Sequence, residues 1–172
     1  MAADDTFVGP IDLSPAFPDG ALFFGERYDT VYLNANGNVS FGGGVPQLDT
    51  SSFPRAPGGL PPRRPTIAVF LADVDTRGRR PQQPIANQIY WTLLPRAGDE
   101  TGRLVATWHE VGYFDQRADA ANTFQLAMVN RGGGDFDVEF RYGRCEWTAG
   151  EREAGEANVV HARVGFDGAD GV

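Results

Sequence analysis

The sequence contains no lysine, and all fifteen of its basic residues are arginines. Schiff-base catalysis by lysine, lysine isopeptide cross-links and a phosphate-binding loop that depends on lysine are therefore excluded. The complete replacement of lysine by arginine is typical of a GC-rich genome, so we expect a bacterial source.

Cysteine and histidine are also scarce. Cys145 is the only cysteine, so no internal disulfide can form. One cysteine and two histidines are too few for the usual structural zinc sites, which need four such ligands. Neither flanking residue of Cys145 biases it toward a reactive thiolate, and we expect it to be a small apolar filler in the interior.

Long apolar runs are missing as well. No stretch reaches the ~18 to 20 apolar residues that a membrane-spanning helix needs, so we expect no membrane insertion. The first five residues are acidic and polar, unlike a secretory signal. The net charge of -8 repels phosphate and argues against nucleic acid as a partner. The same acidity suits divalent cations.

Glycine and proline are abundant, with 22 and 12 residues, and they separate short stretches of alternating or apolar residues. This pattern predicts an all-β fold, an antiparallel β-sandwich with long Gly/Pro-rich loops. At most one or two short helices are expected, near residues 116–121 and 151–157. The predicted strands are residues 29–35, 38–41, 66–72, 87–94, 103–111, 122–130, 136–142 and 161–167.

Asn36-Gly37 separates two of these predicted strands. An Asn-Gly pair between β-rich runs is a strong signal for a two-residue hairpin turn, because both turn positions need a positive φ. That turn would pair Ala35 with Asn38. It would also place Tyr32 directly opposite Phe41.

Several motifs resemble nidogen-like (NIDO) domains, in the same order along the chain. They occupy residues 24–42, 67–77, 87–91, 104–113, 122–126, 140–148 and 162–167. We therefore identify residues 20–172 as similar to a NIDO domain, preceded by residues 1–19 as an extended segment or edge strand. The resemblance implies a secreted, extracellular or cell-surface module associated with cell–matrix adhesion, without catalytic activity. It supplies no binding residue.

Asp73 and Asp75 are the candidate metal ligands. They lie two residues apart after an apolar strand, so their carboxylates point the same way. Calcium takes six to eight oxygen ligands, and nearby loops offer further donors at Asn34, Asn36, Asp49 and Asp115. The alternative is that both acids accept backbone N–H bonds and pair with Arg77, which would organise the turn.

The aromatic residues and the long loop give two further candidates for binding. Trp91, Trp108 and Trp147 are expected in the core, with a sugar-stacking platform as the alternative. The Gly/Pro-rich loop at residues 42–65 is the expected place for a partner site, because binding residues concentrate on loops held by a rigid scaffold.

The predicted function is a non-catalytic adhesion or binding module of a larger surface or matrix protein, with an extracellular protein or glycan as partner. Two alternatives remain. One is a calcium-dependent carbohydrate-binding module. The other is an acidic glycosidase, in which Glu110 and Glu139 would act as the paired carboxylates.

Overall fold

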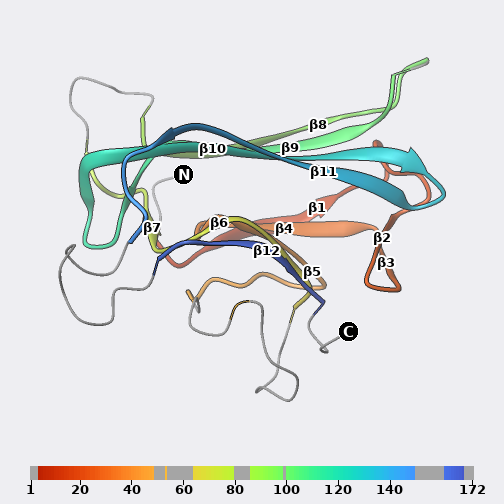
Figure 1. Ribbon diagram of the computed structural model, residues 1–172. Helices are drawn as coiled ribbons and strands as arrows, with labels where there is room; N and C mark the ends of the chain where they lie inside the picture. The colour runs from red at the N-terminus through yellow and green to blue at the C-terminus, as the bar shows by residue number, and fades with distance from the viewer. Residues whose placement is uncertain are drawn as a thin grey trace.

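The computed structural model describes residues 4–48, 53, 64–79, 86–98, 100–149 and 161–168. Within these residues every regular element is a strand, and all strand pairs are antiparallel. The strands form two sheets that face each other as two layers (Figure 1). The prediction of an all-β, antiparallel sandwich is thus confirmed.

The first sheet has five strands in the order β1-β4-β5-β6-β12. They are β1 (Phe7–Asp12), β4 (Thr30–Asn34), β5 (Asn38–Phe41), β6 (Thr66–Leu71) and β12 (Arg163–Asp167). The apolar run predicted to be buried on both faces is β6, and all six of its residues are buried. The second layer covers one face of β6, and Phe53 and Leu48 pack against Ala68 and Leu71 on the other face.

The second sheet has the order β11-β10-β9-β7, and β8 pairs with β9 beside β7. Its strands are β7 (Val74–Asp75), β8 (Gln88–Leu94), β9 (Arg103–Tyr113), β10 (Arg117–Gly132) and β11 (Asp135–Cys145). A separate two-stranded ribbon joins β2 (Ala21–Phe23) to β3 (Glu26–Tyr28). Residues 116–121, a predicted helix, instead form the end of the β9–β10 turn and the start of β10, while residues 151–157 lie outside the described residues.

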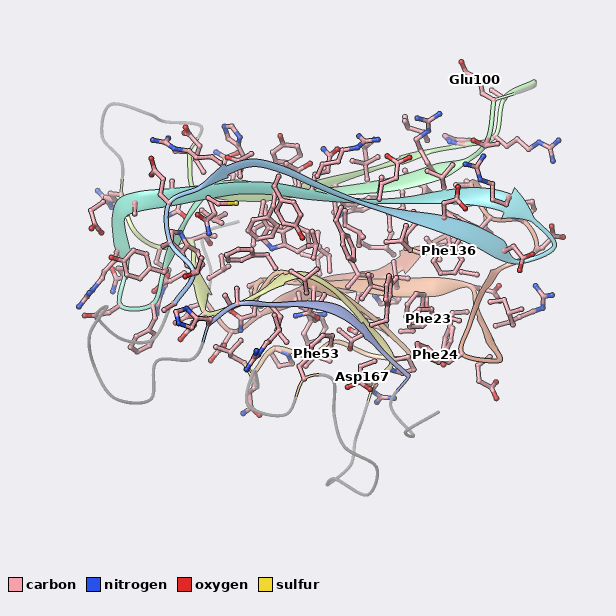
Figure 2. The ribbon with its side chains drawn as sticks, in the orientation of Figure 1. Phe23, Phe24, Phe53, Glu100, Phe136 and Asp167 are labelled. Carbon is pink, nitrogen blue, oxygen red and sulfur yellow. The ribbon has the colours of Figure 1, made fainter. Side chains whose placement is uncertain are left out.

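The core lies between the two layers. Phe124, Leu126 and Met128 of β10 are all buried on one face, as their alternation predicts. They meet the first sheet at β6, where Phe70 stacks on Phe124 with a ring separation of 5.0 Å. At the β2–β3 end, Phe23 of the ribbon and Phe136 of the second sheet approach to a ring separation of 6.2 Å (Figure 2).

The hairpin between β4 and β5 differs from the expected one by a single residue. Asn34 pairs with Asn38, so residues 35–37 form a three-residue loop, and Tyr32 lies opposite Ser40 rather than Phe41. Only Gly37 in this loop has a positive φ, of 76°. The observed register places Val31 opposite Phe41, both buried on the core face. A one-residue slip would turn one of the two strands away from the core.

Candidate functional site

The turn that follows β6 carries the two candidate metal ligands, and both are buried. Asp75 is fully buried, and each of its carboxylate oxygens accepts two hydrogen bonds. Oδ1 accepts the backbone N–H and Nε–H of Arg77, both at 2.9 Å. Oδ2 accepts Nη2–H of Arg77 at 2.6 Å and the backbone N–H of Gln116 at 2.9 Å. This is the geometry of a turn organiser, the alternative expected for the acid pair.

The electrostatics of Asp75 agree with that geometry. Burial by itself raises the pKa of this carboxyl. The hydrogen bonds from Arg77 and from the backbone N–H of Gln116 outweigh burial and hold the pKa below its usual value. Asp75 is therefore a carboxylate with a cationic partner already in place. A metal ion would have to displace Arg77 to reach it, and the calcium role of Asp75 stays a prediction.

Asp73 lies in a different group, with two acids that sequence reasoning missed. Carboxylate oxygens of Asp4, Asp5 and Asp73 all lie within 4.8 Å of one another. We call these three residues the acidic cluster. Asp4 and Asp5 come from the start of the chain, almost seventy residues before Asp73, and no local pattern signals this long-range contact.

Within the acidic cluster the three carboxylates are held differently. Oδ2 of Asp4 lies 2.5 Å from Nη2 of Arg77, while Oδ1 of Asp4 is buried with no hydrogen-bond partner among the described residues. Oδ1 of Asp5 accepts Nδ2–H of Asn36 at 2.8 Å. Burial, and after it the charge of Asp75, raise the pKa of Asp4. The cluster thus holds more negative charge than Arg77 alone neutralises.

The other proposed oxygen donors have structural partners, lie in an exposed turn or fall outside the described residues. The Nδ2 group of Asn34 donates to the side chains of Asn38 and Ser40, and its Oδ1 accepts the backbone N–H of Val45. The Asn36 side chain accepts the backbone N–H of Val74 at 3.1 Å and donates to the carbonyl of Pro46. Asp115 lies in the exposed β9–β10 turn, and Asp49 is outside the described residues.

A second feature, not anticipated from the sequence, is an apolar cleft at one open side of the sandwich. It lies between β8 of one layer and the β1–β4 edge of the other, and its volume is about 270 Å³. Its lining residues, which define the cleft, are Val8, Leu33, Ala35, Ile89, Tyr90 and Trp91.

Large apolar side chains at this cleft remain in contact with solvent. Trp91 is 40% exposed and Val8 36%. The side chain of Tyr90 points to the other face of β8, toward His109, because successive residues of a strand alternate between faces. Sequence reasoning expected all three tryptophans in the core. Trp108 and Trp147 are buried there, but for Trp91 the expectation is wrong, because β8 is an edge strand with the cleft beneath it.

The apolar cleft and the acidic cluster adjoin each other. Ala35 lines the cleft, and its backbone N–H donates to the carbonyl of Thr6 at 2.8 Å. The next residue, Asn36, holds Asp5 of the cluster. One surface therefore combines the half-exposed Trp91 with a group of carboxylates that ranges from exposed Asp5 to buried Asp73.

Cys145, expected in the interior, is exposed at the end of β11. The prediction of a buried filler is therefore wrong. Cys145 lies at the end of an edge strand, beyond an irregularity in the β10–β11 pairing that the local pattern does not reveal.

The carboxylates proposed for a glycosidase do not face each other. Glu139 pairs with Ala127 of β10, which pairs with Val105 of β9, five residues from Glu110. Two strand spacings and five residues of rise separate the backbones by on the order of 20 Å. Glycosidases place their two carboxyl groups about 5 to 10 Å apart. In addition, Glu110 pairs with Arg144 and Glu139 with Arg141.

A family model and the sequences of similar proteins were compared with this chain, and they agree with each other. Residues 29–172 match the model of the nidogen-like domain. The chain is 30% identical over 166 residues to nidogen of Drosophila melanogaster, covering 87% of this chain and 12% of that protein. It is 32% identical over 171 residues to alpha-tectorin of Mus musculus, covering 86% of this chain and 7% of that protein.

The chain therefore spans only a small part of the length of these relatives. No solved structure shows a significant match to it. No helix among the described residues is long and apolar enough to cross a membrane. Because the family model covers most of the sequence and the order of motifs agrees with it, the chain belongs to the nidogen-like (NIDO) domain family.

Proposed function

We propose that this chain is a non-catalytic binding module of a larger extracellular surface or matrix protein, and that it acts through contacts with another protein. The observation that carries the proposal is the apolar cleft with its half-exposed Trp91 and Val8. Soluble proteins rarely leave large adjoining apolar side chains uncovered unless the surface binds something. Aromatic residues are also enriched at protein interfaces.

The absence of a paired acid and base supports the non-catalytic part of the proposal. Among the described residues, Glu110 and Glu139 are each bound to an arginine and lie far apart along the sheet. His109 and His161 lie on or beside strands. His161 bonds to Thr148 at 3.2 Å, and no nucleophile–base–acid triad is formed in this part of the chain.

The test is a binding screen with the purified 172-residue chain immobilised on a sensor. Purified extracellular matrix proteins and immobilised glycans serve as probes, and the heat-unfolded chain serves as the control. We expect saturable binding of at least one protein probe by the folded chain only. Release of reducing sugar from a polysaccharide panel, lost in Glu110→Gln, would contradict the proposal and support the glycosidase.

A second candidate function is calcium-dependent binding, of glycan or protein. The observation that favours it is the unpartnered, buried Oδ1 of Asp4 beside Asp5 and Asp73. A cation in the acidic cluster would supply the missing partner, and carboxylate oxygens are the ligands that calcium prefers. This candidate moves the proposed ligand set from Asp73 and Asp75 to Asp73 with Asp4 and Asp5.

Thermal unfolding with calcium and with EDTA tests this candidate. A ligand that binds only the folded state raises the unfolding midpoint by mass action. A calcium-dependent rise that disappears in Asp73→Asn supports the cation site. An unchanged midpoint at millimolar calcium removes it and leaves the protein-binding proposal intact.

A further inference from the structure

The outer edge of β8 is an unprotected strand edge. Among the described residues, β8 pairs only with β9, so alternate N–H and C=O groups on its other side have no strand partner. Its seven residues, QIYWTLL, include no charge, no proline and no glycine. Proteins normally protect such edges with charged residues, prolines or bulges.

The edge strand across the cleft has that protection. β1 contains Pro10, and its pairing with β4 is irregular between Val8 and Ile11. The contrast between the two edges is informative, because both border the same cleft. The edge of β1 is unsuited to pairing with a further strand, and the edge of β8 is suited to it.

The cleft beneath β8 suits a side chain from an added strand. Side chains of an extended strand alternate between the two faces of a sheet, so a strand paired with β8 would direct every second side chain toward the inner layer. The cleft volume of about 270 Å³ is below the usual range for small-molecule pockets. It is suited to one apolar side chain packed beside Trp91.

The negative charge around the cleft favours one kind of added strand over another. The acidic cluster adjoins the cleft at Ala35, and the whole chain carries a net charge of -8. A second copy of the chain would bring like charges together. A basic segment would instead place lysine or arginine beside Asp4 and Asp5.

We infer that the free edge of β8 binds an extended, basic segment of another protein by strand addition. The segment's apolar side chain fills the cleft beside Trp91, and its basic side chain contacts the acidic cluster. Peptide recognition by strand addition combines main-chain hydrogen bonds for affinity with side-chain pockets for specificity. The inference rests on the proposed protein-binding function and names the surface and the class of partner.

The probe is a blocked nine-residue peptide with the sequence KTVTLTVTK, which places lysine and the apolar residues on one face. It is titrated into the isotopically labelled 172-residue chain, in EDTA so that calcium cannot occupy the acidic cluster. We expect amide shift changes concentrated at residues 88–94 and 5–8. A peptide N-methylated along its pairing edge should bind at least about tenfold more weakly, because it cannot donate those hydrogen bonds.

Two further arms test the pocket and the charge. Trp91→Ala should weaken peptide binding, while the matched variant Phe24→Ala should not. Phe24 has an exposed fraction of 43%, similar to the 40% of Trp91, but it lies in the β2–β3 turn against Gly168, away from β8 in the fold. Replacing both peptide lysines by glutamate should weaken binding about fivefold. That difference should shrink at high salt.

Equal binding by the N-methylated peptide, or shift changes away from β8, would overturn the inference. So would dimerisation of the chain that Trp91→Arg abolishes, since the edge would then bind a second copy. A matrix protein from the binding screen that binds Trp91→Ala unchanged would also overturn it, while leaving the proposed function standing. Peptide binding at β8 without any protein hit in the screen would count against the proposed function alone.

Discussion

The indole N–H of Trp108, on β9, donates a 2.9 Å hydrogen bond to the backbone carbonyl of Ala35 in the β4–β5 loop. Both residues are buried, and the bond connects the two layers of the sandwich. Ala35 also lines the apolar cleft. The position of the cleft floor is therefore fixed from the core side by Trp108.

Replacing Trp108 with phenylalanine should destabilise the fold. The substitution removes the hydrogen bond and leaves a small cavity, which together should cost about 1–3 kcal/mol of unfolding free energy. The Ala35 carbonyl keeps its bond from the backbone N–H of Gly37, which limits the loss. Urea unfolding measures the change. Trp91→Phe, at a half-exposed position, is the control and should stay within about 0.5 kcal/mol of the parent chain.

Gly37 should not tolerate a side chain. Its φ is 76°, and a Cβ atom there would lie 1.9 Å from the carbonyl oxygen of Phe70. Gly37→Ala should therefore lower stability by at least about 2 kcal/mol, since the left-handed conformation alone costs roughly 1–2 kcal/mol. Gly25→Ala is the matched control, with a φ of 84° and nothing within 4 Å of the added atom. Equal losses in the two variants would show that the contact with Phe70 is unimportant.

The strands could be predicted because the local pattern of apolar and polar residues indicates which side chains are buried. Phe124, Leu126 and Met128 point one way, and the apolar run of β6 marks a strand covered on both faces. The hairpin register could not be predicted from Asn36-Gly37 alone. Pairing of the core residues Val31 and Phe41 decided it instead, and this tertiary requirement outweighed the turn preference.

The candidate site was only partly visible in the sequence. Asp73 and Asp75 stand out after an apolar strand, but their different surroundings come from residues distant in sequence. Asp4 approaches Asp73 from the N-terminus, and Gln116 approaches Asp75 from the β9–β10 turn. The cleft depends on β8 and β1 being edges on the same open side, which follows from strand order. Local patterns carry no information about strand order.

Asp4→Asn should leave the fold as stable as before or slightly more stable at pH 7. Burial and the charge of Asp75 raise the pKa of Asp4, so the fold disfavours its charged form despite the contact with Arg77. The stability associated with protonated Asp4 is present below the unfolded pKa of about 4 and is lost as pH rises through the folded value. Thermal unfolding should show a change within roughly 1 kcal/mol that vanishes in acid. A clear loss of stability at pH 7 would contradict this assignment.

Asp75→Asn should act in the opposite direction. The pKa of Asp75 is lowered, so its charged form stabilises the fold above the unfolded pKa of about 4, and this contribution is lost as pH falls through the folded value. At pH 7 the variant loses charge-assisted bonds at a fully buried carboxylate, which should cost about 2 kcal/mol. For a chain of this size, that corresponds to a midpoint lower by roughly 4–8 °C.

The pH dependence separates this charge effect from a simple packing defect. Midpoints of the parent chain and Asp75→Asn, measured from pH 7 down to pH 2, should begin to converge below the unfolded pKa of about 4. They should meet only below the lowered pKa of folded Asp75, where the carboxyl is protonated in both the folded and the unfolded parent chain. Asp137→Asn is the control, since Asp137 pairs with Arg131 on the exposed surface and should contribute little. A gap for Asp75→Asn that stays constant with pH would mean that the shape of the side chain, and not its charge, holds Arg77 and Gln116 in place.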